Sequence, residues 1–263
     1  MMTKEQILSM GQALYQAFRT HQQVDCPSVH YKDVTYEEAY AIQRVMIEEM
    51  KKSGMTVSGK KVGLTSKAMR RVSGINEPDY GFIFSDLSYS NESEIPFGSF
   101  IAPRIECELA FKLKADLDKK DISMQNVLEA TEYVVPCLEI CDFRIYRDKV
   151  QRLITDSIAD NAAFGGYVLG DKPIPLAGVD LSLVPFAFEV NNVQTEVSCG
   201  AAVYDDPALS VAWLANTFCR VGDPLRRGEW VLSGSAVASV PAKQGDHFRC
   251  RYGSLGEVSC KFV

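Results

Sequence analysis

The chain has 263 residues, of which 46% are hydrophobic and 24% charged, so it is long enough to bury a substantial core in one large domain. Its net charge of −6 and its pI near 5.2 argue against nucleic acid or an anionic membrane as a partner. No apolar run reaches the length of a membrane span, and the first residues are polar rather than an apolar signal core.

Eight cysteines are spread along the chain, and several lie in apolar runs, where a free thiol behaves as a small hydrophobic group. Cys137 and Cys141 are spaced C-x₃-C without a second pair or a nearby His, which does not favour zinc. We therefore expect reduced thiols and a cytoplasmic protein.

Two amphipathic helices are predicted in residues 1–56. Each begins with a capping box, at Thr3-x-x-Gln6 and at Thr35-x-x-Glu38, and continues with apolar residues at helical spacing. Nothing in these helices suggests chemistry. We expect them to form an N-terminal helical segment that packs on the body of the protein, residues 57–263.

A short strand that runs through Leu64 is predicted next, followed by a turn at Thr65-Ser66. Strand alternation places Lys60 with Leu64 on the apolar side and Lys61 on the opposite side. A lysine on a buried face can bind a carboxylate or transfer a proton, although a lysine that snorkels to solvent produces the same pattern.

Asp79 lies in the string Glu77-Pro78-Asp79-Tyr80-Gly81, which is typical of a turn or tight loop. The residue has two interpretations, a turn residue or a proton-transfer group. Composition alone favours the turn residue.

The stretch Ile105–Phe111 reads as a strand with two acids on one face. Glu106 and Glu108 are separated by two strand residues, about 7 Å. Two carboxylates in an enclosed space repel each other and lose hydration, and a hard divalent cation such as Mg²⁺ or Mn²⁺ relieves both problems. A solvent-facing edge strand is the alternative, because Glu-x-Glu is a common string.

Glu139 is a third acid, and it lies within the apolar run Tyr133–Ile140. An acid embedded in such a run needs a partner more than an acid on a mixed surface does. Three carboxylates from two strands would leave positions on a metal ion for water and a bidentate substrate. Periodicity alone does not show that the two strands are neighbours.

The segments from Phe82 to Val263 are mostly short, β-branched or aromatic, and interrupted by turn residues. They predict a β-rich α+β body behind the helical segment. The predicted strands include Val184–Val190 and Val193–Val197 around an Asn191-Asn192 turn, then Trp230–Ser235 and Phe248–Tyr252, and the predicted helices are Met124–Ala130 and Pro207–Arg220.

Several strings occur together and in one order: GKKVGLTSKAM, EPDYG, PRIECELAF, YVVPCLE, DSIADNA, GEWVLSGS and GDHFRCRYGSLGEVSCKFV. In this respect the chain resembles the 2-oxo-4-enoate hydratases and 4-oxalocrotonate decarboxylases of aromatic meta-cleavage degradation, within the fumarylacetoacetate hydrolase superfamily. The likeness extends from about residue 35 to the C-terminus. The sequences EPDYG and GLTSKAM are most similar to those of the branch that hydrates 2-oxohept-4-ene-1,7-dioate.

The resemblance implies a mixed β-roll that binds Mg²⁺ or Mn²⁺ through Glu106, Glu108 and Glu139. It also implies that Lys60 and Asp79 are an acid/base pair near the substrate.

In the same resemblance Lys60, Leu64, Asn161 and Ser235 contact the substrate, a small 2-oxo acid. The Gly234-Ser235 turn would hold its carboxylate, where the wider superfamily more often has Gly-Thr. A homo-oligomer is expected, as is association with a homologous decarboxylase or hydratase.

The activity that we expect is addition of water to a 2-oxo-4-enoate, or its 2-hydroxy-2,4-dienoate form, to give a 4-hydroxy-2-oxo acid. A decarboxylase that uses the same metal site is the first alternative, and a non-catalytic partner of such an enzyme is the second. Hydrolysis of a carbon–carbon bond is less favoured, because no His of this chain begins the His-x-x-Glu motif of the hydrolase branch.

A longer substrate with a second carboxylate would need a distal cation. Arg144, Arg147 and Arg152 are candidates because they follow Glu139 closely in the sequence. A surface position is the alternative for each of them.

Overall fold

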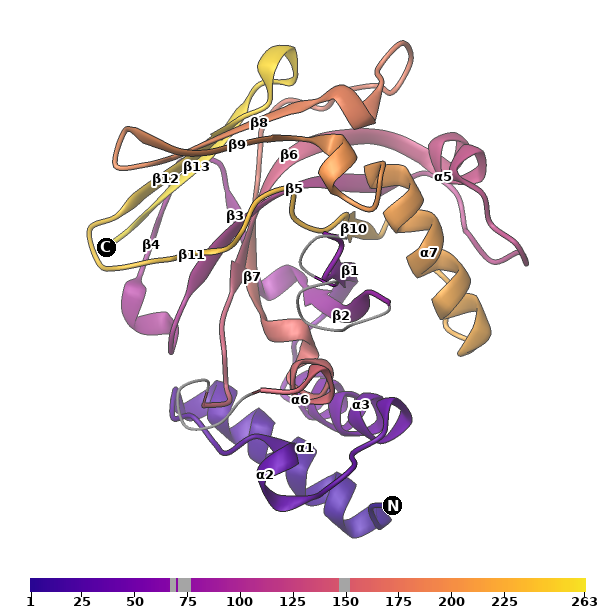
Figure 1. Ribbon diagram of the computed structural model, residues 1–263, viewed down its shortest axis with the longest axis vertical. Helices are drawn as coiled ribbons and strands as arrows, with labels where there is room; N and C mark the ends of the chain where they lie inside the picture. The colour runs from indigo at the N-terminus through magenta and orange to yellow at the C-terminus, as the bar shows by residue number, and fades with distance from the viewer. Residues whose placement is uncertain (67–69, 71–76, 147–151) are drawn as a thin grey trace.

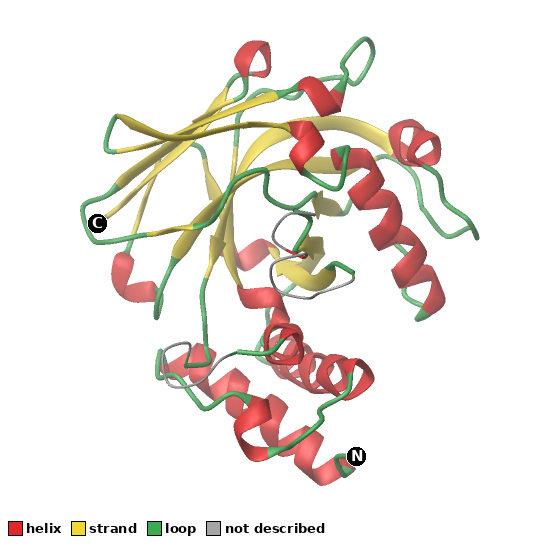
Figure 2. Cartoon of the chain, in the orientation of Figure 1, coloured by secondary structure: helices red, strands yellow, loops and turns green. Residues whose placement is uncertain are grey.

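Two β-sheets lie against each other around the main apolar core of the computed structural model, which describes residues 1–66, 70, 77–146 and 152–263 (Figures 1 and 2). The larger sheet has the strand order β2-β1-β10-β5-β6-β7-β3, with β11 added on β5. Its strands are β1 (Val57–Gly63), β2 (Asp79–Phe84), β3 (Ser88–Ser90), β5 (Arg104–Leu113), β6 (Thr131–Cys141), β7 (Phe164–Leu169), β10 (Trp230–Leu232) and β11 (Val240–Pro241).

The smaller sheet has the order β4-β13-β12-β8-β9. Its strands are β4 (Ser93–Ile95), β8 (Pro185–Val190), β9 (Val193–Cys199), β12 (His247–Arg251) and β13 (Glu257–Phe262). Both sheets contain parallel and antiparallel pairs, because β1–β10, β3–β7 and β4–β13 run parallel while their other neighbours run antiparallel. The expected α+β class with mixed sheets is therefore confirmed.

The larger sheet curls so that its β1–β2 end approaches β7. The hydroxyl of Ser58 on β1 lies 3.1 Å from that of Tyr167 on β7, although β10, β5 and β6 separate these strands in the sheet. Gln43 adds a link from the helices, since its side-chain amide donates to the carbonyls of Tyr80 and Ile158 at 2.9 Å each. The roll brings side chains from distant strands into one enclosed space.

The helices at the N-terminus lie together at one end of the molecule (Figure 1). Both predicted capping boxes are present, at Thr3 before α1 and at Thr35 before α3. Helix α3 also packs on α6, a helix that was not predicted from the sequence. The helices are α1 (Lys4–Thr20), α2 (Pro27–His30), α3 (Tyr36–Lys52), α5 (Met124–Ala130), α6 (Ile154–Ala159) and α7 (Pro207–Arg220).

Several local predictions agree with the structure. Helices α5 and α7 have the predicted bounds, and Asn191 and Asn192 join β8 to β9 with φ angles of 52° and 65°. One strand was predicted too long: β10 ends at Leu232, and residues 233–235 form a turn whose Gly234 has a φ of 93°. Gly234 packs directly on Thr65, whose side chain would lie 2.2 Å from an added Cβ.

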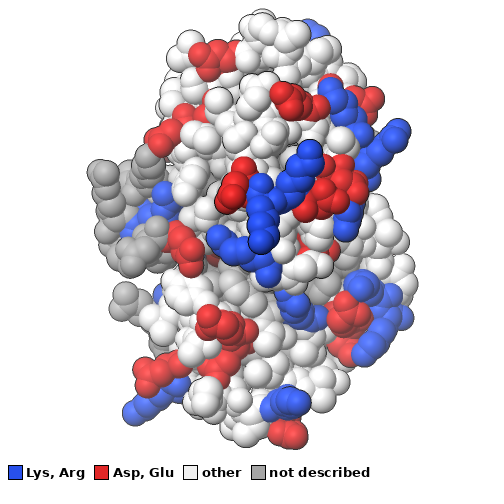
Figure 3. All heavy atoms as spheres, turned by 90° about the vertical axis from the view of Figure 1, so that its right-hand side faces the viewer, with Lys and Arg blue, Asp and Glu red and all other residues white. Residues whose placement is uncertain are grey.

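The surface carries charges of both signs. On the face that Figure 3 shows, basic and acidic side chains lie beside one another, so neither sign dominates that face. All eight cysteines fall in the described part of the chain and are free thiols. Among the described residues, no helix combines the length and the apolar character needed to cross a membrane.

A buried ion pair ties the end of β6 to α6. The Arg144 guanidinium contacts the Asp160 carboxylate and donates to the carbonyls of Phe164 and Asp160, at 2.7 and 2.6 Å. Both side chains of the pair are at most 1% exposed. Arg144 is therefore a structural residue. Both interpretations of it from the sequence, a surface position and a partner for a distal carboxylate, are wrong.

We expect Arg144→Met to lower the free energy of unfolding by about 3–5 kcal/mol, because it leaves the Asp160 carboxylate buried and unpaired. Urea unfolding followed by circular dichroism measures this change. The double variant Arg144→Met/Asp160→Asn should recover part of the loss. A single variant as stable as the unmodified protein would contradict the structural role of the pair.

Candidate metal and active site

Three carboxylates converge where β5 pairs with β6. Glu106 stands directly opposite Glu139 in the antiparallel register, and Glu108 follows on the same face of β5. One ligand atom each from Glu106, Glu139 and Cys141 lies within 4.8 Å of the others. The two predicted strands are thus neighbours, and the structure brings Glu106 and Glu139 together. Glu108 lies beside Glu139 but outside this cluster of ligand atoms.

The oxygens of these carboxylates are incompletely satisfied. Glu108 Oε2 accepts the backbone N–H of Gly234 at 2.8 Å, whereas Glu108 Oε1 and Glu139 Oε2 are buried without a hydrogen-bond partner. Buried orphan oxygens are costly unless a proton or a cation occupies the space between them. This donor set fits a hard divalent cation, with the Cys141 thiol as a softer neighbour.

Burial and mutual repulsion raise the pKa values of Glu106 and Glu108. Desolvation, followed by the charge of Glu139, raises the pKa of Glu106 to about 7. The same two causes raise the pKa of Glu108 well above its usual range. In the absence of a cation, protons therefore occupy part of the site near neutral pH.

Lys61 is the lysine that reaches the acids. Its ammonium contacts Glu139 Oε1 and donates to the carbonyl of Ala162 at 2.9 Å. Burial is the largest single influence on the pKa of Lys61 and lowers it, but the charge of Glu139 together with the other acidic groups of the site outweighs burial and raises this pKa above the ordinary lysine value. Lys61 therefore stays charged inside the site.

Lys60 points to the other face of β1, away from Asp79, so the structure does not bring together the Lys60–Asp79 pair that the resemblance implied. Its ammonium binds Glu229 Oε1 at 2.7 Å and lies 5.1 Å from the centre of the Phe218 ring on α7. Strand alternation could not separate the two lysines because β1 is covered on both faces, and each lysine is only 2% exposed.

Asp79 begins β2 and lies beside Lys61 on the inner face. The register pairs Gly63 with Asp79 and Lys61 with Gly81, so Lys61 and Asp79 are diagonal neighbours. A Cβ on Gly63 would lie 2.1 Å from Asp79 Oδ1, so the glycine leaves room for the acid. Asp79 Oδ1 is buried without a partner, and desolvation raises the pKa of this carboxyl. Asp79 is therefore a strand residue of the site rather than a turn residue.

A short left-handed segment completes the inner wall. Asn161, Ala162 and Ala163 have φ angles of 52°, 48° and 58°, a conformation that non-glycine residues rarely adopt in succession. The segment aims the Ala162 carbonyl at Lys61. Asn161 was expected to contact substrate, but its amide pairs with the backbone of Phe82 at 2.8 and 2.9 Å, which anchors the segment to β2.

The outer part of the site is a pocket of about 300 Å³. Leu64, which has a φ of 56° just after β1, and Ser235 both line it, and their contact with a substrate stays a prediction. The Ser235 hydroxyl already donates a hydrogen bond to the backbone carbonyl of Val237, at 2.7 Å. Glu106 connects this pocket to the carboxylates.

Sequence reasoning missed three contributors to the site. They are Cys141, the Ala162 carbonyl and Arg104, which lines the pocket two residues before Glu106. The spacing 137–139–141 on β6 could have indicated Cys141, because alternate residues share a face. A backbone carbonyl set by a left-handed turn leaves no comparable signal. Arg147 lies outside the described residues.

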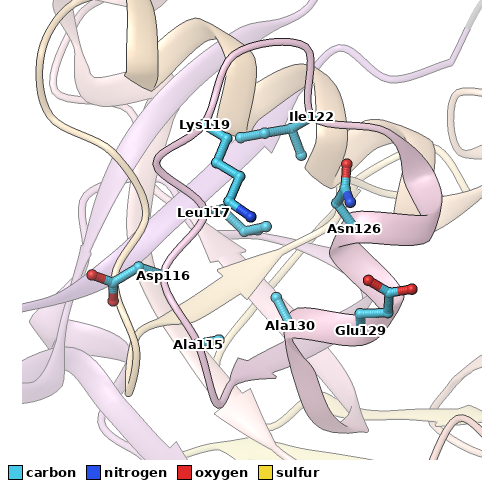
Figure 4. Close-up of a pocket in the computed structure, with 8 residues that line it drawn as sticks. All are labelled: Ala115, Asp116, Leu117, Lys119, Ile122, Asn126, Glu129 and Ala130. Carbon is cyan, nitrogen blue, oxygen red and sulfur yellow. The ribbon is translucent and has the colours of Figure 1, made fainter.

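A second pocket, of about 190 Å³, lies between α5 and the loop that follows β5 (Figure 4). Its charged side chains are Asp116, Lys119 and Glu129. This loop follows the last residue of β5, which is five residues beyond Glu108 and seven beyond Glu106, so the pocket lies about 17–23 Å along the strand from these two acids. It is therefore separate from the carboxylate site.

Comparison with known proteins places this chain in a family. The chain is 40% identical over 258 residues to the 2-oxo-hept-4-ene-1,7-dioate hydratase of Escherichia coli, with 97% of each chain covered. It is 38% identical over 261 residues to the 2-keto-4-pentenoate hydratase of Paraburkholderia xenovorans, covering 99% of this chain and 96% of that protein. No protein-family model matches the chain.

Solved structures agree. The 4-oxalocrotonate decarboxylase of Pseudomonas putida G7, complexed with magnesium and adipate, superimposes with a TM-score of 0.95 at 29% identity over 100% of this chain and 99% of that one. The fumarylpyruvate hydrolase of Pseudomonas aeruginosa, in complex with Mn²⁺ and pyruvate, shares the fold at 18% identity, with a TM-score of 0.63 over 78% of this chain and 88% of that one.

The fold is thus that of the fumarylacetoacetate hydrolase superfamily. Within it, the chain belongs to the family of 2-oxo-4-enoate hydratases, which are hydro-lyases.

We expect the affinity for Mn²⁺ to increase as pH rises between about 6 and 8, because protons on carboxyls such as Glu106, whose pKa is raised to about 7, compete with the cation. Calorimetric titration in two buffers of different ionisation enthalpy should show that binding releases protons. Glu108→Gln should weaken binding, while Glu94→Gln, at an exposed position, should not. Affinity that does not change with pH would contradict the shifted pKa.

Proposed function

We propose that the protein is a divalent-metal-dependent hydratase that adds water to a 2-oxo-4-enoate and produces a 4-hydroxy-2-oxo acid. The observation that carries the proposal is the convergence of Glu106, Glu108 and Glu139 with Lys61 and Asp79 in one enclosed space. Membership of a family of named hydratases supports it. Mg²⁺ or Mn²⁺ is the cation that we propose, since these ions prefer carboxylate oxygens.

The three glutamates would hold the cation at the inner end of the pocket. Their unpartnered oxygens, Glu108 Oε1 and Glu139 Oε2, are the atoms available to it. When bound, a divalent cation supplies Lewis-acid stabilisation of negative charge on the oxygen of a 2-oxo acid. The pocket walls at Leu64 and Ser235 would then hold the body of the substrate beside the acids.

Asp79 is our candidate for the proton-transfer group. Its Oδ1 has no partner, and burial raises the pKa of its carboxyl above the usual aspartate value, which favours the protonated form. In the proposed reaction Asp79 carries a proton between the C2 hydroxyl and C5 of the dienoate, which gives a conjugated enone. Water then adds at C4.

Lys61 replaces Lys60 in this proposal. Its ammonium keeps a positive charge beside the position of the C2 oxygen and fixes the orientation of Glu139. It remains protonated because the surrounding acidic groups together raise its pKa, so it acts as an electrostatic partner and hydrogen-bond donor. The Ala162 carbonyl holds it in place.

A decarboxylase is the second candidate, because the TM-score of 0.95 to a 4-oxalocrotonate decarboxylase covers the whole chain. The same carboxylates would then serve loss of CO₂ from a vinylogous position without addition of water. The two reactions give products of different mass.

We expect the protein with Mg²⁺ to convert 2-oxo-4-enoates into products that gain the mass of water. Incubation with mono- and dicarboxylic members of this class, followed by mass spectrometry and assay of released CO₂, measures the outcome. Stoichiometric CO₂ without hydration would instead assign the decarboxylase. Failure of both reactions with Mg²⁺ and with Mn²⁺ would reject the proposal.

We expect Lys61→Met to lower kcat by about 10²–10⁴, because the site loses a group that stabilises developing charge. The matched control is the double variant Lys60→Met/Glu229→Gln, which removes the partly buried ion pair on the opposite face of β1. Its kcat per folded molecule should stay within a few-fold of the unmodified protein. Equal losses in both variants would contradict the separate roles of the two lysines.

A further inference from the structure

Two arginines line the outer part of the active-site pocket, and neither has a carboxylate partner among the described residues. Arg104 and Arg152 border the same 300 Å³ pocket as Glu106. Of the described residues that line this pocket, Glu106 is the one acid. The Glu106 carboxylate lies at the inner end of the pocket, beside Glu139. The outer end therefore has an excess of positive charge.

Arg104 is positioned by β5 itself. It lies two residues before Glu106 on the same face of the strand, about 7 Å further along. Its Nε donates to Ser239 Oγ at 2.8 Å, and its Nη2 donates to the Ser239 carbonyl at 2.5 Å. These bonds fix the plane of the guanidinium and leave Nη1 free of any bond to the described residues.

Arg152 borders the pocket next to Phe143. The central carbon of its guanidinium lies 5.0 Å from the centre of the Phe143 ring, and the side chain is half-buried. No acid of the described chain lies within ion-pair distance of it. The charge of Arg152 also lowers the pKa of Asp79, so its field extends into the site. A stacked guanidinium keeps its edge nitrogens available to an anion.

The charges of the inner end cancel in the working enzyme. Three glutamates would be offset by the divalent cation and the Lys61 ammonium when Asp79 is protonated, the form that its raised pKa favours. The two arginines of the outer end have no such compensation within the described chain. A guanidinium that closes on an apolar substrate end would lose hydration without gaining a partner, whereas a carboxylate there would accept charge-assisted hydrogen bonds.

From this arrangement we propose that the preferred substrate is a dicarboxylic 2-oxo-4-enoate, and that Arg104 and Arg152 bind its distal carboxylate. The proposal rests on the function proposed above and specifies the substrate class of the same site. A seven-carbon dioate whose oxo-acid end lies at Glu106 is long enough to bring its other carboxylate to the arginines. A five-carbon monocarboxylic substrate would end before reaching them.

The test compares 2-oxohept-4-ene-1,7-dioate with 2-oxopent-4-enoate in steady-state assays with Mg²⁺. We expect kcat/KM to be about 10–100-fold higher for the dioate, as two charge-assisted contacts allow. Arg152→Gln should raise KM for the dioate about tenfold or more, and it should lower kcat/KM for the dioate much more than for the monocarboxylic substrate. Arg104→Gln should act in the same direction, and Arg19→Gln, at an exposed position on α1, is the control of equal charge change.

Preference for the monocarboxylic substrate, or equal losses for both substrates in the arginine variants, would overturn the inference. Turnover of neither substrate would reject the proposed function, and the inference would then be decided by binding alone. Calorimetry with Mg²⁺ and the saturated analogues 2-oxoheptanedioate and 2-oxopentanoate makes that comparison. Tighter binding of the dioate that Arg152→Gln abolishes supports the distal site, and equal binding of the two analogues refutes it.

Discussion

The structure has to accommodate two carboxylates of like charge, Glu106 and Glu139, which lie directly opposite each other on β5 and β6. Like charges directly opposite in a sheet destabilise it, and burial increases the cost. Lys61 supplies the compensating charge, but it comes from β1, and β10 and β5 lie between β1 and β6 in the sheet. The ammonium reaches Glu139 because the sheet rolls over. The charge balance of the site therefore depends on the curvature of the sheet.

Much of the fold could be predicted because local rules decided it. The threonines that begin α1 and α3 form the capping boxes that their spacing indicates, and the Asn191-Asn192 turn has the left-handed angles that a tight hairpin needs. The acids of β5 and β6 were also predictable, since a carboxylate within an apolar strand needs a partner. Family resemblance supplied the pairing of these strands, and the register of β5 with β6 shows it.

The parts that sequence reasoning missed depend on tertiary structure. Alternation could not choose between Lys60 and Lys61, because α7 covers one face of β1 and the acids cover the other. Asn161 has a polar side chain close to the site in the chain, yet its amide serves the backbone of Phe82. The Ala162 carbonyl contributes through backbone geometry alone. Such contributions have no sequence pattern, because they depend on how the roll closes.

The two adjacent lysines of β1 raise the question of what prevents the strand from pairing one residue out of alignment. Such a slip moves every side chain to the opposite face, yet it would still present a lysine to the acids. Glycines supply the missing discrimination. A methyl group on Gly59 would lie 1.8 Å from the Trp230 carbonyl oxygen, and one on Gly63 would lie 2.1 Å from Asp79. Only one alignment places a hydrogen atom at both points. Two residues without side chains thus select the lysine that serves the active site.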